Sequence, residues 1–337
     1  MNDSANHVSR RDFLKLGLAG LGGLCAAGAV ARLAWGQQTP PRSQVEEMLQ
    51  PRPKKATVYQ INEPKLLDDF EKVRVQDYLP EVVHHVLQKM TGTSRPAAAW
   101  RQFFSPQDII GIKFDPVAAD ELRTTSAIAM MILFSLRDAG FKADKIMLLE
   151  GPNYTPGMET AAVPFGYQEQ AVTVHKGLQT HFLRALGKVT AILNVPFIKD
   201  HRSLGLSCGT VNMTLGFVNN PGQFLEASGD PAVAELLARD EIRKKHRLTL
   251  VNGIRGIYDG GPRAEEGKIW NQCSILVGTD LLAVDRVAMD LIDAARSSRG
   301  LRGLAESGRS PKYLDAAARM GLGTRELSEI EVHRVGI

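Results

Sequence analysis

Short apolar runs alternate with amphipathic segments along most of this chain. The apolar runs are compact and rich in β-branched and aliphatic residues, which is typical of buried strands. They lie at residues 57–61, 109–114, 145–150, 189–195, 248–252 and 274–277. Apolar positions at helical spacing predict helices at residues 80–90, 126–139, 231–247 and after Asp280. Strands that alternate with helices predict an α/β fold, a mostly parallel sheet with helices on both faces.

The two ends of the chain depart from this alternation. Residues 37–56 hold four prolines among polar and basic residues, which predicts a linker. Residues 301–337 contain one more helix around Lys312–Met320 and a strand-like segment at Ile330–Val335. We therefore expect one α/β domain over residues 57–300, with residues 301–337 packed on it as a C-terminal extension.

The first 36 residues have the features of an export signal. Ser9–Lys15 matches the twin-arginine signature, whose address residues here are Arg10, Arg11, Phe13 and Leu14. The apolar stretch Leu16–Ala31 that follows is shorter than the roughly 20 residues a spanning helix needs, and Arg32 interrupts it. We expect residues 1–36 to be a twin-arginine signal peptide, read by the twin-arginine translocase, that delivers a folded protein to the periplasm.

Two small-x-small patterns suit signal cleavage. Ala34-Trp35-Gly36 is favoured over Ala29-Val30-Ala31, because a polar run follows it directly. Cleavage at residue 36 and retention of the signal both stay open. Once the signal is removed, we expect no stable membrane span.

Composition excludes several classes of partner. The chain has a formal net charge of +4, and the first 36 residues carry four basic and two acidic residues, which leaves +2. A near-neutral chain with 6% aromatic residues gives no reason to expect nucleic acid or an anionic membrane as a partner.

Only two cysteines, Cys208 and Cys273, follow the signal, and no C-x-x-C motif exists. This excludes an iron–sulfur cluster of the usual ferredoxin spacing and a thioredoxin-like site. The pair can form a disulfide in an oxidising compartment. Two buried free thiols are favoured, because Cys273 opens an apparent strand.

Polar residues stand at the predicted strand ends. In parallel sheets, ligands bind beyond the carboxyl ends of the strands. This rule selects Lys113, Asp115, Glu150, Lys199, His201, Asn252 and Asp280.

The sharpest motif is Val195–His201, a strand that runs into a proline and then into Lys199, Asp200 and His201. A lysine here can bind an anion as a point charge, and a histidine can act as acid, base or metal ligand. The alternative is a solvated turn with surface salt bridges. The segment from Asn252 to Pro262 predicts a glycine-rich loop that can offer backbone N–H groups to an anion.

Two other features have both structural and functional interpretations. Asp280 can simply cap the helix that follows it. Asp285 lies on an apolar helix face and needs a partner, for which Lys199 or Lys113 are candidates. Lys113 itself lies within a buried strand, where a charge is costly unless paired or functional.

Four segments resemble motifs of the domain of unknown function 362 family, in the same order and over roughly residues 57–297. They are Phe104–Lys113, Val195–His201, Gly209–Gly216 and Asp280–Asp285. The chain most resembles those members of the family that are exported by the twin-arginine route and have no iron–sulfur cluster. The resemblance implies no established reaction; some relatives carry ferredoxin domains, which suggests redox work, but this chain has none.

Three positions depart from the family pattern. Asn212-Met213 stands where the family has Lys-Asn, Asp115 where it has Asn, and Asn252 where it has Asp. The family site is therefore altered in this chain.

We thus expect an uncharacterised exported protein that binds a small anionic ligand or a metal in a redox-related or enzymatic role. The expected catalytic residues are Lys113, Lys199, His201, Asp280 and Asp285, and the expected binding residues are Asp115, Glu150, Asn212 and Asn252. The identity of any metal or cofactor stays open, as does catalysis itself. The alternative is a non-catalytic binding or assembly protein of the cell envelope, in which these lysines and aspartates pair structurally.

Overall fold

The computed structural model describes residues 55–74, 78–152 and 159–337. The predicted export signal, with Arg10, Arg11, Phe13 and Leu14, lies outside these residues, as does nearly all of the predicted linker. Lys54–Ile337 forms one compact unit. Within the described ranges, every helix is too short or too polar to cross a membrane.

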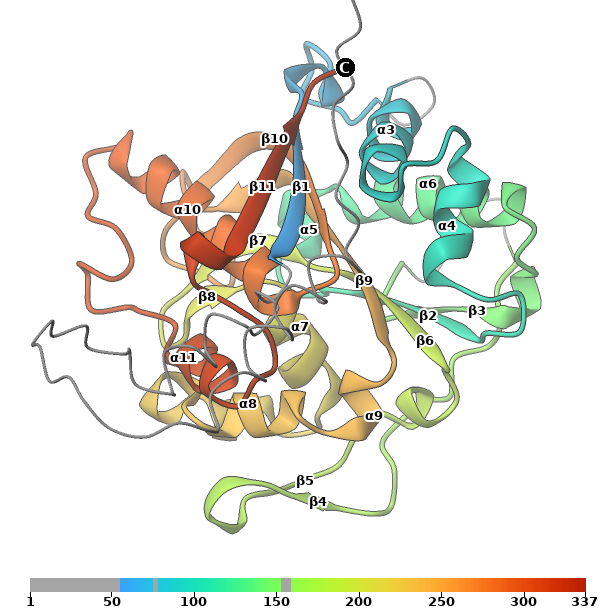
Figure 1. Cartoon of the computed structure of the whole chain (residues 1–337). Coiled ribbons are helices and arrows are strands. Elements are labelled where there is room, and N and C mark those ends of the chain that lie inside the picture. Colours follow the sequence, from blue (N-terminus) through green and yellow to red (C-terminus); the bar gives the residue numbers. More distant parts are fainter. Residues whose placement is uncertain (1–54, 75–77, 153–158) are drawn as a thin grey trace, which may run out of the picture. The chain divides into compact units, whose positions relative to one another are not determined.

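Nine of the described strands form one sheet, in the order β11-β1-β10-β9-β6-β2-β3, with β7 paired to β9 and β8 paired to β7 (Figure 1). These strands are β1 (Ala56–Asn62), β2 (Ile110–Phe114), β3 (Ile146–Leu149), β6 (Ala191–Val195), β7 (Phe197–His201), β8 (Gly205–Ser207), β9 (His246–Ile257), β10 (Ile269–Gly278) and β11 (Ile330–Val335). Two further strands, β4 (Val172–Thr173) and β5 (Gln179–Thr180), pair separately.

The sheet is mostly parallel, as the sequence predicts. Strands β3, β2, β6 and β9 run parallel to one another, β7 runs parallel to β9, and β11 runs parallel to β1. Strand β10 is antiparallel to both of its neighbours, and β8 is antiparallel to β7. The α/β class is thus confirmed.

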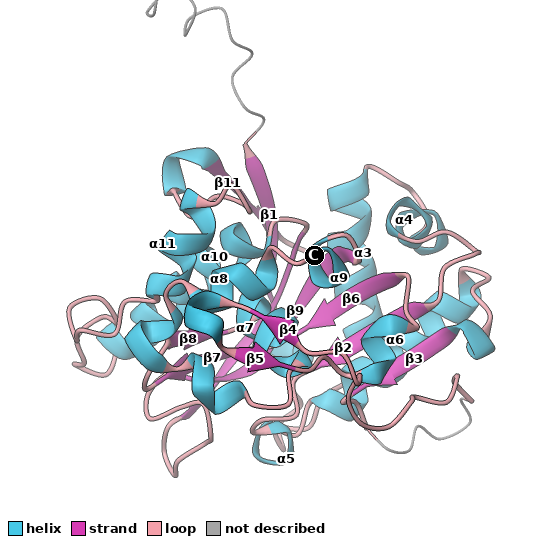
Figure 2. Cartoon of the chain, turned by 90° about the horizontal axis from the view of Figure 1, so that it is seen from below, coloured by secondary structure: helices cyan, strands magenta, loops and turns pink. Residues whose placement is uncertain are grey.

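Helices cover both faces of the sheet (Figures 1 and 2). On one face lie α3 (Leu79–Thr91), α4 (Pro96–Phe103) and α6 (Thr125–Asp138); on the other lie α7 (Gly209–Thr214), α8 (Ala232–Leu237), α10 (Leu281–Ser297) and α11 (Lys312–Arg319). The short helices α5 (Ala119–Leu122) and α9 (Asp240–Arg243) complete the described set. Along β6, Ala191 and Leu193 belong to one core and Ile192 to the other, because successive strand side chains point to opposite faces.

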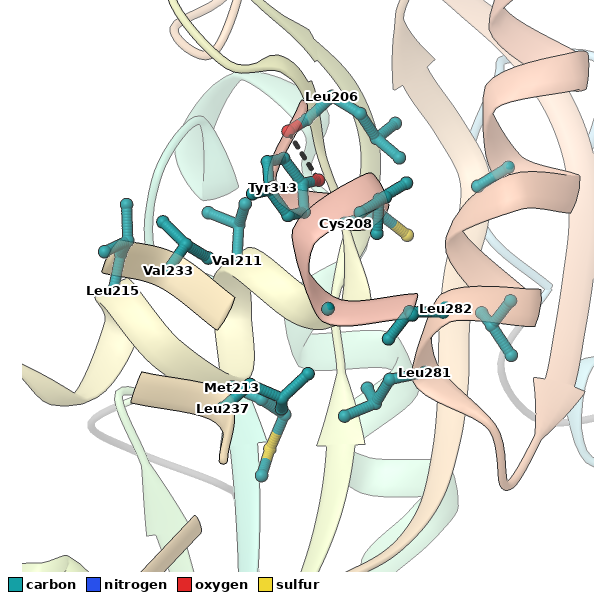
Figure 3. Close-up of a cluster of buried hydrophobic side chains, with 14 of the residues drawn as sticks. Leu206, Cys208, Val211, Met213, Leu215, Val233, Leu237, Leu281, Leu282 and Tyr313 are labelled. Carbon is teal, nitrogen blue, oxygen red and sulfur yellow. Dashed lines mark hydrogen bonds between the residues drawn. The ribbon is translucent and has the colours of Figure 1, made fainter. Parts of the chain in front are cut away.

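Helix α7 is six residues long and is held by packing. Its Val211 and Met213 lie in the cluster of Figure 3, with Val233 and Leu237 of α8, Leu281 and Leu282 of α10, and Tyr313 of α11. The Tyr313 hydroxyl donates to the Leu206 carbonyl oxygen at 3.1 Å. All six residues of α7 are buried, and the side chains of Asn212 and Thr214 find hydrogen-bond partners inside the protein.

The segment predicted as one helix at residues 231–247 differs from this expectation. It breaks into α8 and α9, and β9 already begins at His246. Residues 252–256, predicted as a glycine-rich loop, lie inside β9. A Cβ at Gly256 would approach the Trp270 ring and lie 2.7 Å from the Ile198 carbonyl oxygen, so glycine here permits close strand packing.

Lys199 and His201 are also not in a solvated turn. They belong to β7, which continues the strand direction beyond Pro196 and pairs on both sides. Cys208 and Cys273 are both buried free thiols.

Candidate functional site

A cavity of about 640 Å³ opens beyond the carboxyl ends of β2, β3 and β7. Four of the residues predicted from sequence line it: Asp115, Glu150, His201 and Asn212. They come from four separate segments of the chain, which the parallel sheet brings to one edge. A larger cavity of about 1220 Å³ shares Glu150 and Tyr167 with it but none of the other predicted residues.

Lys113 lies fully buried beneath this cavity, near the end of β2. Its Nζ lies 2.5 Å from Glu150 Oε2, and it donates to Asn212 Oδ1 at 2.9 Å and to the Phe114 carbonyl oxygen at 2.6 Å. These three acceptors match the three N–H donors of an ammonium group. Lys113 is therefore fully paired, and its charge is compensated by Glu150.

Lys199 is also fully buried, and its carboxylate partner is Asp115. Its Nζ lies 2.8 Å from Asp115 Oδ2 and donates to the Val117 carbonyl oxygen at 2.8 Å. The other oxygen of Asp115 accepts from the Val117 N–H at 3.0 Å. The two acceptors leave one N–H of Lys199 without a partner among the described residues.

His201 lines the cavity with its ring orientation fixed by backbone. Its Nδ1 lies 3.2 Å from the backbone nitrogens of both Ser203 and Leu204, and both N–H groups donate to it. Burial, with the Lys199 ammonium nearby, lowers the pKa of His201 to about 4. The ring is therefore neutral at pH 7, and with Nδ1 accepting, its proton resides on Nε2.

Asn212 joins the strand ends to α7. Its Oδ1 accepts from Lys113 Nζ, and its Nδ2 donates to the Lys113 carbonyl oxygen at 3.1 Å and to Asn194 Oδ1 at 2.8 Å. Sequence reasoning missed Asn194, which is buried and lies beside Lys113 in the β2–β6 register. A polar residue within the apolar run 189–195 was the available signal.

Asp285 is buried in α10, and it accepts hydrogen bonds from the backbone of α7 rather than from a lysine. Its Oδ1 accepts from the Gly209 N–H at 2.6 Å and its Oδ2 from the Thr210 N–H at 3.0 Å. Burial raises its pKa to about 6, against the opposing effect of these donors. The expected pairing with Lys113 or Lys199 is thus wrong, because the first N–H groups of a helix supply the partner instead.

Asp280 does not belong to the cavity edge. Because β10 is antiparallel to β9, its last residue Gly278 pairs with Thr249, near the amino end of β9. Asp280 caps α10 by accepting from the Ala283 N–H, and it also accepts from the Thr324 N–H, both at 3.0 Å. The strand-end rule therefore placed Asp280 at the wrong end of the parallel strands, because it lies near their amino ends.

Asn252 is buried behind the site. Its Nδ2 donates to Thr124 Oγ1 at 2.9 Å, just before α6, and its Oδ1 has no partner among the described residues. It does not line the cavity.

A network of hydrogen bonds and ion pairs on the other side of β7 holds the loop between β9 and β10 at the rim of the cavity. Asp200 Oδ1 accepts from the Gly261 N–H at 2.6 Å, and Arg309 lies 2.6 Å from Asp200 Oδ2 and 3.0 Å from Asp259 Oδ1. The loop carries Arg263, an exposed cavity-lining residue without an ion pair in the described part of the chain. Sequence reasoning missed Arg263, because nothing in its local pattern indicates which rim it reaches.

Within the described ranges, no three or more His, Cys, Asp or Glu side chains are grouped so as to hold a metal ion.

Comparison with known proteins gives one result. The family model described as Domain of unknown function (DUF362) matches residues 143–290, a span that includes Glu150, Lys199, His201 and Asn212. Lys113 and Asp115 precede the matched span. No curated protein and no solved structure matches the chain.

Proposed function

From the membership of this chain in the domain of unknown function 362 family, which brings no reaction with it, we propose that the 640 Å³ cavity binds a small anionic ligand in an enzymatic or redox-related role. One observation carries the proposal. Asp115, Glu150, His201 and Asn212 reach the same cavity from four segments, above two lysines that are buried at a cost in free energy.

His201 supplies a hydrogen-bond donor to such a ligand. Its neutral ring has Nδ1 occupied by two backbone N–H groups, so Nε2–H is the group free to donate. A neutral imidazole of low pKa can polarise a carbonyl or carboxylate oxygen without carrying a charge itself. This arrangement favours a donor role for His201 over the acid, base and metal-ligand roles expected from sequence.

The charges around the cavity suit an anion. Lys113 and Lys199 are compensated by Glu150 and Asp115, so the four groups together contribute no net charge. Arg263 at the rim adds one positive charge that is not compensated in the described structure. The two carboxylates remain available as acceptors for a hydroxyl or amine on the same ligand, or as a general base.

Export by the twin-arginine route is part of the proposal. It rests on Arg10, Arg11, Phe13 and Leu14, and it places the activity in the periplasm. A protein exported in this way folds in the cytoplasm, so any ligand it carries can be loaded before export.

The rival function is a non-catalytic binding or assembly protein. The specific observation in its favour is that each buried lysine already has a carboxylate partner, as a purely structural ion pair would.

Thermal melting of the full-length protein separates an anion-binding cavity from an assembly protein whose buried ion pairs are purely structural. Inorganic phosphate, acetate and citrate would each be added to the parent and to His201→Phe, with His175→Phe as a control because His175 does not line the cavity. We expect at least one anion to raise the Tm of the parent and of His175→Phe but not that of His201→Phe. Equal shifts for all three proteins, or none for any, would favour the assembly protein with purely structural ion pairs. Native mass spectrometry of protein purified from its own compartment would then identify the ligand.

A further inference from the structure

The cavity that contains the candidate site has an apolar wall that an inorganic anion would leave uncovered. The wall comes from the segment between residues 211 and 225, where Val211, Leu215, Val218 and Leu225 all line the cavity. The first three are at least nine-tenths buried. Val211 and Leu215 also appear in Figure 3, where they border the core around α7.

The polar side of the cavity is separate in origin. Asp115, Glu150, His201 and Ser207 come from the ends of β2, β3, β7 and β8. The two asparagines of this segment that line the cavity have their side chains engaged elsewhere, Asn212 with Lys113 and Asn219 with Thr180 and the His181 N–H. The strand ends thus supply the polar groups, and the 211–225 segment supplies the apolar surface.

The size of the cavity also exceeds what a bare anion fills. Ligand pockets of about 300–1,000 Å³ hold small organic molecules and are mostly apolar, with a few polar groups that fix orientation. At about 640 Å³, this cavity lies within that range.

We propose that the ligand is an organic acid with an apolar body, whose carboxylate lies at His201 and Arg263 and whose body lies against Val211, Leu215 and Val218. The inference rests on the proposed function, because it names the ligand class of the same site. Oxyanions without a body, such as phosphate, would occupy only the polar side and bind weakly.

A homologous series of probes tests this. Acetate, butyrate and hexanoate share one carboxylate and differ in apolar length, while hexanol has the body without the charge. Binding to the full chain would be measured by calorimetry, and the melting temperature of each variant without probe would verify folding. We expect affinity to rise roughly threefold to fourfold for each methylene group buried, and hexanol to bind at least about tenfold more weakly than hexanoate.

Variants that preserve the shape of the side chain test whether Val211 and Val218 contact the apolar body of the ligand. Val211→Thr and Val218→Thr replace one methyl group by a hydroxyl, so each should weaken hexanoate binding more than acetate binding and lower the hexanoate-to-acetate affinity ratio by roughly threefold or more. The matched control is Val163→Thr, since Val163 lines the neighbouring 1220 Å³ cavity instead. A ratio lowered by the control variant alone would put the body in that other cavity and overturn the inference.

The remaining outcomes separate this inference from the proposed function. If the carboxylates bind with the same affinity at every chain length, the apolar body is excluded and the anion site stands. If none of the carboxylates binds, or hexanol binds as tightly as hexanoate, the anionic ligand fails and the inference fails with it. Loss of carboxylate binding in Arg263→Gln, with hexanol unaffected, would support both.

Discussion

At the residue scale, the site consists of two buried ion pairs that face a cavity. A buried charge is costly by itself, and removing one partner of a pair costs more than the pair contributes. Lys113 and Lys199 have no exposed surface, whereas Glu150 is one-third exposed. The lysines are thus the fixed partners, and Glu150 is the partner that can also contact a ligand in the cavity.

Replacing Glu150 with glutamine should leave the Lys113 ammonium uncompensated. We expect a loss of roughly 3 kcal/mol in the free energy of unfolding, the lower end of the cost for a broken buried pair, because Glu150 is partly exposed. Urea denaturation would measure the loss. Glu265→Gln is the matched control: its pair with Arg202 is exposed, so its loss should be below about 1 kcal/mol. Equal losses in both variants would show that the Lys113–Glu150 pair is not buried in effect.

Asp285 should make stability depend on pH. Its pKa is about 6 in the folded protein against an ordinary value of 3.8, so the folded state holds the proton more tightly. The stabilisation is complete below about pH 4 and is lost as the pH rises through about 6. Asp285→Asn, which does not titrate, should therefore gain on the parent by up to about 3 kcal/mol between pH 4 and pH 7. Denaturation of both proteins at the two pH values tests this; a constant difference between them would contradict the shifted pKa.

At the scale of the elements, β9 is the strand that organises the site. It pairs with β6, with β7 and with β10. It therefore joins strands β6, β2 and β3, which lead to Asp115 and Glu150, to strands β10, β1 and β11. Close contact with both β7 and β10 is possible only because Gly253 and Gly256 lack side chains. The position of β7, and thus of Lys199 and His201, depends on these glycines.

Gly256→Ala should therefore destabilise the protein, since its Cβ would meet the Trp270 ring and the Ile198 carbonyl oxygen. We expect a loss of about 1–3 kcal/mol, the usual cost of overpacking. Gly222→Ala is the control, because a Cβ at Gly222 has no atom within 4 Å, and it should change stability by less than about 0.5 kcal/mol. A melting temperature for Gly256→Ala equal to that of the control would disprove the close packing of β7 on β9.

At the scale of the whole molecule, the sheet joins strands that are far apart in the sequence. Strand β1, the first described, pairs on one side with β10 and on the other with β11, which ends at Val335. Asp280 also connects α10 to Thr324. The first and the last described strands therefore lie side by side in the same sheet.

The export proposal predicts a specific failure. Replacing both Arg10 and Arg11 with lysine keeps the charge but removes the pair that the translocase reads as an address. We expect the precursor to accumulate in the cytoplasm, folded and with an unchanged melting temperature. Cell fractionation would measure this, with Arg32→Lys as the control that should export normally. Normal export of the double variant would exclude the twin-arginine route.

The local pattern of the sequence determined most of the elements. Apolar runs and helical spacing located β1, β2, β3, β6, α3 and α6 to within about two residues, and they located the start of α10, because burial on one or both faces imposes a period that neighbouring residues reveal. The strand-end rule also selected Asp115, Glu150 and His201, which do meet at one cavity. These predictions succeeded because they needed only the direction of parallel strands.

What only the tertiary structure decided is how non-neighbouring segments pair. Asp280 was expected at the cavity and lies at the opposite edge, because the antiparallel direction of β10 is set by its partners β1 and β9 and not by its own residues. Asp285 was expected to meet a lysine and instead meets the N–H groups of α7, 76 positions away in the case of Gly209. Strand direction and ion-pair choice depend on contacts between distant segments, and a local pattern contains no record of which distant segment will arrive.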